Sequence, residues 1–128
     1  MIGFFDSGVG GLTVLHECLV SLPAEDYLYV GDSGHFPYGT KQPDELQRRA
    51  VAIAQYLFEQ RVKLLVIACN SATAAAGPLI RQMGEQAGVP VITVVEPEAE
   101  IAAAISENGR VGVLATPATV TSGAYRVA

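Results

Sequence analysis

Residues 64–76 read LLVIACNSATAAA, and this stretch decides the fold. Leu64–Ala68 is an unbroken apolar run of the length of a buried strand. The alanine-rich segment Thr73–Gln86 that follows has the length of a helix. A thiol, an amide and a hydroxyl fall at the junction. A buried strand that passes directly into a helix is typical of α/β proteins with parallel sheets.

The same alternation of apolar runs and helical segments extends along the whole chain. We predict strands at Ile2–Phe5, Tyr27–Val30, Leu64–Ala68, Val91–Val95 and Val111–Leu114. We predict helices at Gly11–Ser21, Pro43–Gln60, Thr73–Gln86 and Pro97–Glu107. The sequence therefore predicts an α/β fold in which helices flank a parallel sheet through right-handed crossovers.

The last residues predict a second unit. TPATVTSGAYRVA, residues 116–128, is typical of a helix capped by Thr116, and no terminator follows before Ala128. We expect a first α/β domain over residues 1–95 and the beginning of a second α/β domain over residues 96–128. We also expect the chain to be part of a longer protein.

Composition narrows the class of protein. The formal net charge of −5 and the pI near 4.9 argue against nonspecific nucleic-acid binding. No apolar run approaches the roughly 20 residues of a membrane helix, and the first residues lack a basic leader. With two cysteines and no export signal, we expect a cytoplasmic protein without a structural disulfide.

Polar side chains follow every predicted strand. The segments after the strands are DSGVGG, GDSGHFPYG, CNSAT, EPE and ATPAT. In open parallel sheets, ligands bind beyond the carboxyl ends of the strands, where loops and helix N-termini converge. The sequence therefore predicts one site at this edge.

Cys69 is the candidate reactive group. It lies between a strand and a helix, and a helix N-terminus lowers the pKa of a thiol. Asn70 and Ser71 add hydrogen-bond donors for an anion there. The alternative is that Cys69 is a small buried hydrophobe. Cys18 is predicted to pack on a helical face shared with Leu12, Leu15 and Leu19.

Asp6 and Ser7 follow the first strand, where the acid could also be a helix cap. The glycines after them suggest a dinucleotide site, but Thr13 occupies the third glycine position of that motif. Asp6 would also point an anion at the pyrophosphate. An acid and a hydroxyl fit a cation better, such as an amino group.

The loop HFPYG could be only a turn, or it could bind a ligand. The backbone amides of Tyr38 and Gly39 can donate to an anion, with the tyrosine ring as a wall. His35 could act in acid–base chemistry or be held by its own turn. No histidine or cysteine has partners at metal-ligand spacing, and no lysine lies where a pyridoxal phosphate would need one. We expect no metal and no cofactor.

Four blocks of the sequence carry a family resemblance. IGFFDSGVGGLTVL, YVGDSGHFPYGTK, VIACNSATA and VGVLATPATVTSGAY together resemble the cofactor-independent aspartate/glutamate racemase superfamily, in particular its glutamate racemases. The resemblance runs from Ile2 to Tyr125 in the same order. It implies two pseudo-symmetric α/β domains with the substrate between them, and interconversion of L- and D-glutamate by two cysteines on opposite faces.

The resemblance also implies roles for individual residues. Cys69 is similar to the first catalytic cysteine, and Asp6 and Ser7 to the residues near it and near the substrate amino group. By the same resemblance, Asn70 and Ser71 donate hydrogen bonds to the α-carboxylate of the substrate. Tyr38 and Gly39 donate to its side-chain carboxylate. Thr116 and Thr119 match the threonines of the loop that opens the second domain.

Two features depart from the family pattern. Ala115 stands where the family usually has glycine, and the later Cys-Thr-His motif with the second cysteine is absent. Cys18, on a helix, cannot replace that cysteine. We therefore expect this chain to be inactive alone, as part of an enzyme that supplies D-glutamate for peptidoglycan. The family's frequent dimers allow a homodimer.

Other functions fit parts of the pattern. A flavodoxin-like module could bind a small amino acid or anion without turnover, and an aspartate racemase would share the two-carboxylate site. A nicotinamide-dependent oxidoreductase is disfavoured by Asp6.

Overall fold

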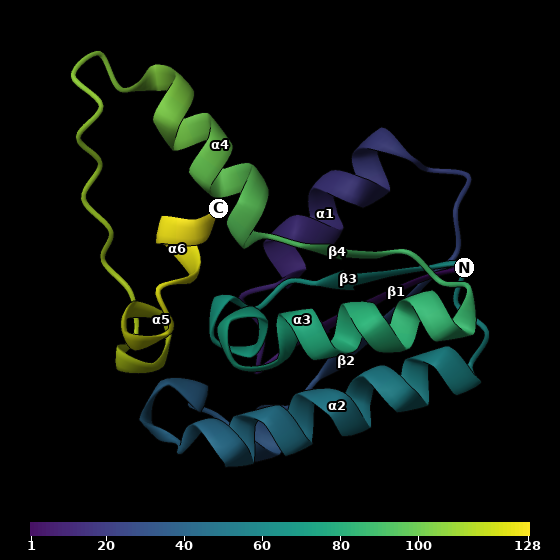
Figure 1. The fold of residues 1–128 in the computed structure, drawn as a ribbon. Helices are drawn as coiled ribbons and strands as arrows, with labels where there is room; N and C mark the ends of the chain where they lie inside the picture. Colours follow the sequence, from purple (N-terminus) through teal and green to yellow (C-terminus); the bar gives the residue numbers. More distant parts are fainter.

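The computed structural model describes residues 1–128 and contains one four-stranded parallel sheet (Figure 1). The strand order is β2-β1-β3-β4, so the first strand of the sequence is central. The strands are β1 (Ile2–Asp6), β2 (Tyr27–Gly31), β3 (Leu64–Ile67) and β4 (Val91–Thr93). All three pairings are parallel, which confirms the predicted α/β class.

Helices cover both faces of the sheet unequally. Helices α2 and α3 lie side by side on one face, and α1 lies on the other (Figure 1). The helices are α1 (Leu12–Ser21), α2 (Pro43–Glu59), α3 (Asn70–Ala87), α4 (Val95–Ile105), α5 (Pro117–Ser122) and α6 (Ala124–Val127). Two short 3-10 turns, η1 (Ser33–His35) and η2 (Tyr38–Thr40), lie between β2 and α2.

The main core lies between the sheet and the helix pair α2–α3. Helix α2 buries four side chains that recur every three or four residues, as its apolar periodicity predicts: Leu46, Ala50, Ala54 and Leu57. Side chains from β1, β3 and α3 complete this cluster, among them Phe5, Leu65, Ile67 and Ile80. Burying each large aliphatic or aromatic side chain stabilises the fold by about 1.5–3 kcal/mol.

Replacing Ile80 with alanine is expected to lower the free energy of unfolding by about 2–5 kcal/mol, because it leaves a cavity in a packed core. Ile80 is fully buried, whereas the adjacent Leu79 is 38% exposed. Leu79→Ala is therefore the matched control, and we expect a much smaller loss. Urea denaturation measures the free energy of unfolding of each variant. Equal losses in Ile80→Ala and Leu79→Ala would contradict this placement of the core.

Helix α1 packs differently from the prediction. Leu12 and Leu19 are exposed, at 45% and 47%. Instead, Val14, Leu15 and Cys18 contact the smaller cluster formed by Ile2, Phe4 and Val66 on the second sheet face. The predicted packing role of Cys18 is thus confirmed, but its helical neighbours in the core are only partly those expected.

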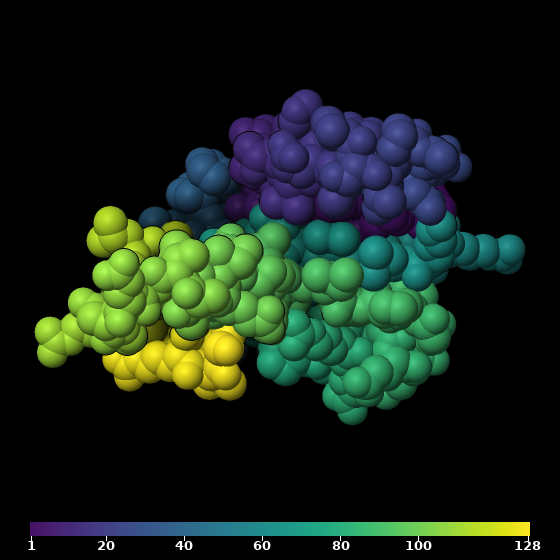
Figure 2. Space-filling model, turned by 90° about the horizontal axis from the view of Figure 1, so that it is seen from above, coloured from purple at the N-terminus to yellow at the C-terminus, as the bar shows by residue number.

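The predicted fifth strand, Val111–Leu114, is wrong. This segment is extended but pairs with no strand, and the Leu114 side chain is fully exposed. The reason lies in β4, which ends at Thr93 because the chain turns into α4 at the buried Val95. Figure 1 shows α4 and the segment after it projecting away from the sheet, and in Figure 2 this segment (light green) extends at one end of the molecule.

The C-terminal helix begins as predicted but ends earlier. Thr116 caps α5, with its side chain accepting from the Thr119 amide. The prediction that no terminator follows is wrong, because Gly123 adopts a left-handed conformation (φ 69°) and separates α5 from α6. None of the helices is long and apolar enough to span a membrane.

Candidate active site

The pairing of β1 with β3 brings Asp6, Ser7 and Cys69 together. Phe5 and Ile67 are partners in the parallel register, so the residues that follow the two strands lie side by side. The Cys69 thiol lies 3.5 Å from the Ser7 hydroxyl oxygen, to which it donates. All three of the site side chains are buried. The meeting of strand ends that the sequence predicted is therefore present.

Cys69 is also the N-cap of α3. The helix begins at Asn70, three residues earlier than predicted, and the Cys69 sulfur accepts a hydrogen bond from the Ala72 amide at 3.4 Å. Burial raises the pKa of the Cys69 thiol above its usual value, and the charge of Asp6 adds to this. Hydrogen bonds with Ser7 and with the Ala72 amide oppose the rise without cancelling it.

The predicted lowering of the thiol pKa is therefore wrong for this structure. The capping hydrogen bond from the Ala72 amide and the hydrogen bonds with Ser7 do stabilise a thiolate, but loss of hydration disfavours the charge more strongly. In the chain alone, Cys69 is a thiol that keeps its proton at neutral pH.

This pKa has a measurable consequence. The pH midpoint of Cys69 alkylation should lie above the thiol's ordinary value in the folded chain and return to about 8.5 in urea. Because folding raises the thiol pKa, protonated Cys69 contributes to the free energy of unfolding. This contribution is fully present below the pKa of the unfolded chain and is lost as the pH rises through the pKa of the folded chain. A Cys18→Ala background isolates the signal, and a folded midpoint at or below the urea value would contradict the burial argument.

Asp6 uses one carboxylate oxygen to organise the loop after β1. Its Oδ2 atom accepts from the amides of Gly8 at 3.0 Å and Gly11 at 3.3 Å. No hydrogen bond within the protein reaches Oδ1. The predicted alternative of a helix cap is wrong, because the N-cap of α1 is Gly11 and no side chain caps it. One Asp6 oxygen instead holds the loop backbone, and the other has no hydrogen bond within the protein.

Helix α5 forms the opposite wall. The Ser71 and Thr116 hydroxyl oxygens are 2.9 Å apart, and those of Thr116 and Thr119 are 3.1 Å apart. A side chain added at Gly39 would place its Cβ 2.6 Å from Cγ2 of Thr116, so the wall and the turn η2 are in close contact. A hollow of about 850 Å³ opens here, and its lining includes Ser7, Tyr38, Gly39, Ser71 and Thr116.

Asn70 carries an unmatched buried acceptor. Its side-chain oxygen is out of contact with solvent and has no hydrogen-bond partner. Since an unsatisfied buried polar atom is costly, a bound molecule or a rotated amide would be favourable at this position. Asn70 is next to Cys69 in the chain, so this acceptor lies at the α3 end of the site.

Tyr38 and His35 both contact the carboxylate of Asp32, the residue that follows β2. The Tyr38 hydroxyl donates to Asp32 Oδ2 at 2.7 Å, and His35 Nδ1 lies 2.6 Å from Asp32 Oδ1. Burial raises the pKa of the Asp32 carboxyl, but the His35 and Tyr38 hydrogen bonds outweigh it and bring the pKa below its usual value. His35 is thus held by its own turn, one of the two predicted alternatives.

The Tyr29 hydroxyl was not predicted as part of the site. It donates to the Gly8 carbonyl at 3.2 Å, and the charges of Asp6 and Cys69 both affect its pKa. The sequence offers no signal for this, because Tyr29 lies inside a strand and not after one.

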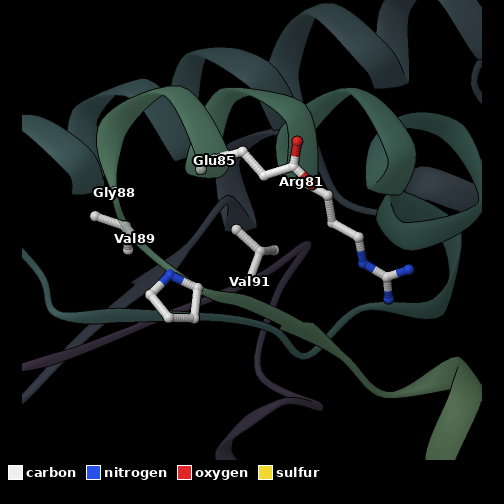
Figure 3. A pocket seen from close by; sticks show the side chains of 7 residues that line it. Arg81, Glu85, Gly88, Val89 and Val91 are labelled. Atoms are coloured by element: carbon white, nitrogen blue, oxygen red, sulfur yellow. The ribbon is translucent and has the colours of Figure 1, made fainter.

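A second hollow lies away from these residues. It is formed at the carboxyl end of α3 and the start of β4, with a volume of about 380 Å³ (Figure 3). Arg81, Glu85, Gly88, Val89 and Val91 line it, and none of the predicted site residues does. Within the structure, no three side chains among His, Cys, Asp and Glu are grouped as metal ligands.

Comparison with known proteins gives a consistent result. A family model described as Asp/Glu/Hydantoin racemase matches residues 9–128. The chain is 48% identical over 124 residues to a glutamate racemase of Geobacter metallireducens, covering 97% of this chain and 45% of the relative. It is also 48% identical to the glutamate racemase of Pseudomonas aeruginosa, covering 46% of that relative.

Solved structures show the same likeness. The glutamate racemase of Thermus thermophilus in complex with beta-chloro-D-alanine has a TM-score of 0.87 and 48% identity over 98% of this chain. That of Francisella tularensis in complex with D-glutamate has a TM-score of 0.89 and 40% identity. This chain covers 47% and 46% of those two chains, so it spans about half the length of the proteins it resembles.

Proposed function

The chain belongs to the Asp/Glu/Hydantoin racemase family, and from this premise we propose that it carries one half of a cofactor-independent glutamate racemase site. The observation that carries the proposal is the placement of Cys69 beside Ser7 and Asp6, at the carboxyl ends of two neighbouring parallel strands. Close relatives over this part of the chain are named glutamate racemases.

In the proposed reaction, the Cys69 thiolate removes the α-proton of the amino acid. The C–H bond breaks, an S–H bond forms, and the electron pair moves toward the α-carboxylate. Asn70 and Ser71 donate hydrogen bonds to that carboxylate, which stabilises the developing charge in a site with little water. The free oxygen of Asp6 receives the substrate ammonium group.

The raised thiol pKa sets a requirement for this reaction. The thiol must lose its proton before it can act as a base. Burial is the main effect that disfavours this loss, and the nearby carboxylate of Asp6 adds a smaller one. A substrate ammonium beside Asp6 neutralises this charge and favours the thiolate. We therefore propose that the reactive form is produced when substrate binds.

Racemisation also needs a proton donor on the opposite face of the substrate. Cys18 does not supply it, since it packs on the small cluster of Ile2, Phe4 and Val66. We propose that the second group belongs to a longer protein, in which residues 1–95 form the first domain and residues 96–128 begin the second. This chain alone then does not racemise glutamate.

The proposed substrate preference depends on the residues across the site from Cys69. We propose that the Tyr38 and Gly39 amides hold the side-chain carboxylate, that Thr116 and Thr119 complete the site, and that glutamate is preferred to aspartate. Support comes from the named relatives and from the hollow next to these residues. A cytoplasmic role in supplying D-glutamate for peptidoglycan, and assembly as a homodimer, are part of the same proposal.

A second candidate is an amino-acid binding module without turnover. The observation that favours it is the raised pKa of Cys69, since a protonated thiol is unreactive as a base. The two candidates differ in solvent exchange: a single thiol that removes and returns the α-proton exchanges it with solvent without inverting the carbon, whereas a pure binder exchanges nothing.

Incubation with L-glutamate in deuterium oxide separates these cases. We expect the α-proton NMR signal to fall slowly with Cys69 present, no loss with Cys69→Ala, and no D-glutamate from either chain. Exchange that persists in the Cys69→Ala chain would remove this thiol from the mechanism. Appreciable D-glutamate from the unmodified chain would contradict the requirement for a second group.

A further inference from the structure

A tyrosine of β2 forms a hydrogen bond with the backbone of the loop Ser7–Gly11. The Tyr29 hydroxyl donates to the Gly8 carbonyl at 3.2 Å. The Gly8 amide, on the same residue, donates to Asp6 Oδ2 at 3.0 Å. Gly8 is therefore hydrogen-bonded both to the Tyr29 hydroxyl and to the Asp6 carboxylate.

The loop has little room to shift around this contact. A Cβ added at Gly31 would lie 2.5 Å from the Gly8 carbonyl oxygen. A Cβ added at Gly11 would lie 2.8 Å from the Ala68 Cβ and 3.1 Å from the Tyr29 hydroxyl oxygen. The end of β2 and the residue after β3 thus approach the loop backbone closely, and the Tyr29 hydroxyl lies next to both Gly8 and Gly11.

Tyr29 keeps its proton over the physiological range. Burial raises the pKa of Tyr29 to about 12, and the charges of Asp6 and Cys69 add to the rise. The hydroxyl is therefore a donor to the loop and is not available as an acid or base near neutral pH.

We propose that Tyr29 is a positioning residue that seats the loop Ser7–Gly11, so that Asp6 and Ser7 stay beside Cys69. This inference rests on the proposed function for its catalytic meaning, but the geometry can be tested without turnover. The ionisable groups that act on the Cys69 thiol or respond to it come from three elements: Asp6 on β1, Tyr29 on β2 and Tyr38 on η2.

The thiol itself reports the position of the loop. Cys69 belongs to a buried apolar cluster that includes Phe5, Tyr38 and Ala72. Ser7, at the start of the loop, lowers the thiol pKa through its side chain and its backbone. A displaced loop removes these two hydrogen bonds and also weakens the effect of the Asp6 charge. Because each of the two hydrogen bonds affects the thiol pKa more than that charge does, the pKa should rise further while the thiol stays buried.

The test compares two tyrosines of the same strand. In a Cys18→Ala background, Tyr29→Phe is expected to raise the pH midpoint of Cys69 alkylation by iodoacetamide by about 0.5 unit or more. Tyr27→Phe is the matched control, because it removes the same atom and breaks hydrogen bonds to the Cys18 and Leu22 carbonyls at 2.9 Å, outside the site loop. Its midpoint should stay unchanged.

Two further variants make the result specific. Ser7→Ala should raise the midpoint, and adding Tyr29→Phe to it should produce a smaller further rise than Tyr29→Phe alone, since the side-chain hydrogen bond is already lost and only the backbone one remains. Gly31→Ala pushes on the same Gly8 carbonyl and should shift the midpoint upward even where Tyr29→Phe does not fold.

Equal shifts in the two phenylalanine variants, or none in Tyr29→Phe, would overturn the role of Tyr29. A wrong proposed function would give a different result. The unmodified chain would then show no deuterium exchange with glutamate, while the pH midpoints of Cys69 alkylation would still shift as expected.

Discussion

Replacing Cys69 with alanine is expected to abolish racemisation in a complete enzyme, with a loss of about 10²–10⁴-fold or more, the range for a positioned acid–base group. The residue lies at the meeting of β1 and β3, beside Ser7 and next to the unmatched oxygen of Asn70. No other thiol of the chain lies there, because Cys18 is on α1.

A chimera allows this measurement. Residues 1–128 are joined to the remaining part of the Geobacter metallireducens relative, which is 48% identical over the shared segment. Circular dichroism follows the conversion of each enantiomer of glutamate. Cys18→Ala is the matched control and should retain racemase activity with a modest loss of stability. Ordinary turnover in the Cys69→Ala chimera would exclude this thiol as a base.

Asp6→Asn is expected to lower kcat in the same chimera by about 10²-fold or more, within the range for acid–base groups. The substitution keeps an oxygen for the Gly8 and Gly11 amides, so the loop can remain in place. It replaces the free carboxylate oxygen with a donor, which cannot accept from the substrate ammonium.

The control for this variant is Asp44→Asn, which removes one negative charge at an exposed position in the first turn of α2. Its kcat should equal that of the parent chimera. The effect of Asp6→Asn should also appear in the pH profile, since the charge of Asp6 raises the Cys69 pKa. We expect the acidic limb of the profile, along which activity rises as the thiol ionises, to move to lower pH. An unchanged profile together with an unchanged kcat would remove Asp6 from the site.

Much of the candidate site could be predicted because its residues follow directly from strand ends. Asp6 and Ser7 come after β1, and Cys69 comes after β3; parallel pairing places those ends at one edge. Apolar runs and glycine positions are local properties, so they identify strands and loops without knowledge of their neighbours.

The missed features depend on partners distant in the sequence. Val111–Leu114 has the composition of a strand, but a strand needs a neighbour, and α4 leads this segment away from β4. Tyr29 lies 21 residues from Gly8 along the chain, and only the pairing of β1 with β2 brings its hydroxyl under the loop.

The sequence by itself determined the four strands of the sheet and the helices between them, the edge at which the chemistry gathers, and the family to which these motifs belong. Only the tertiary structure decided the protonation of Cys69. A helix N-terminus acts over one turn and can be seen in the sequence, whereas burial is produced by every element packed around the thiol. Here burial is the larger effect, so the sulfur holds its proton until something in the site changes its surroundings.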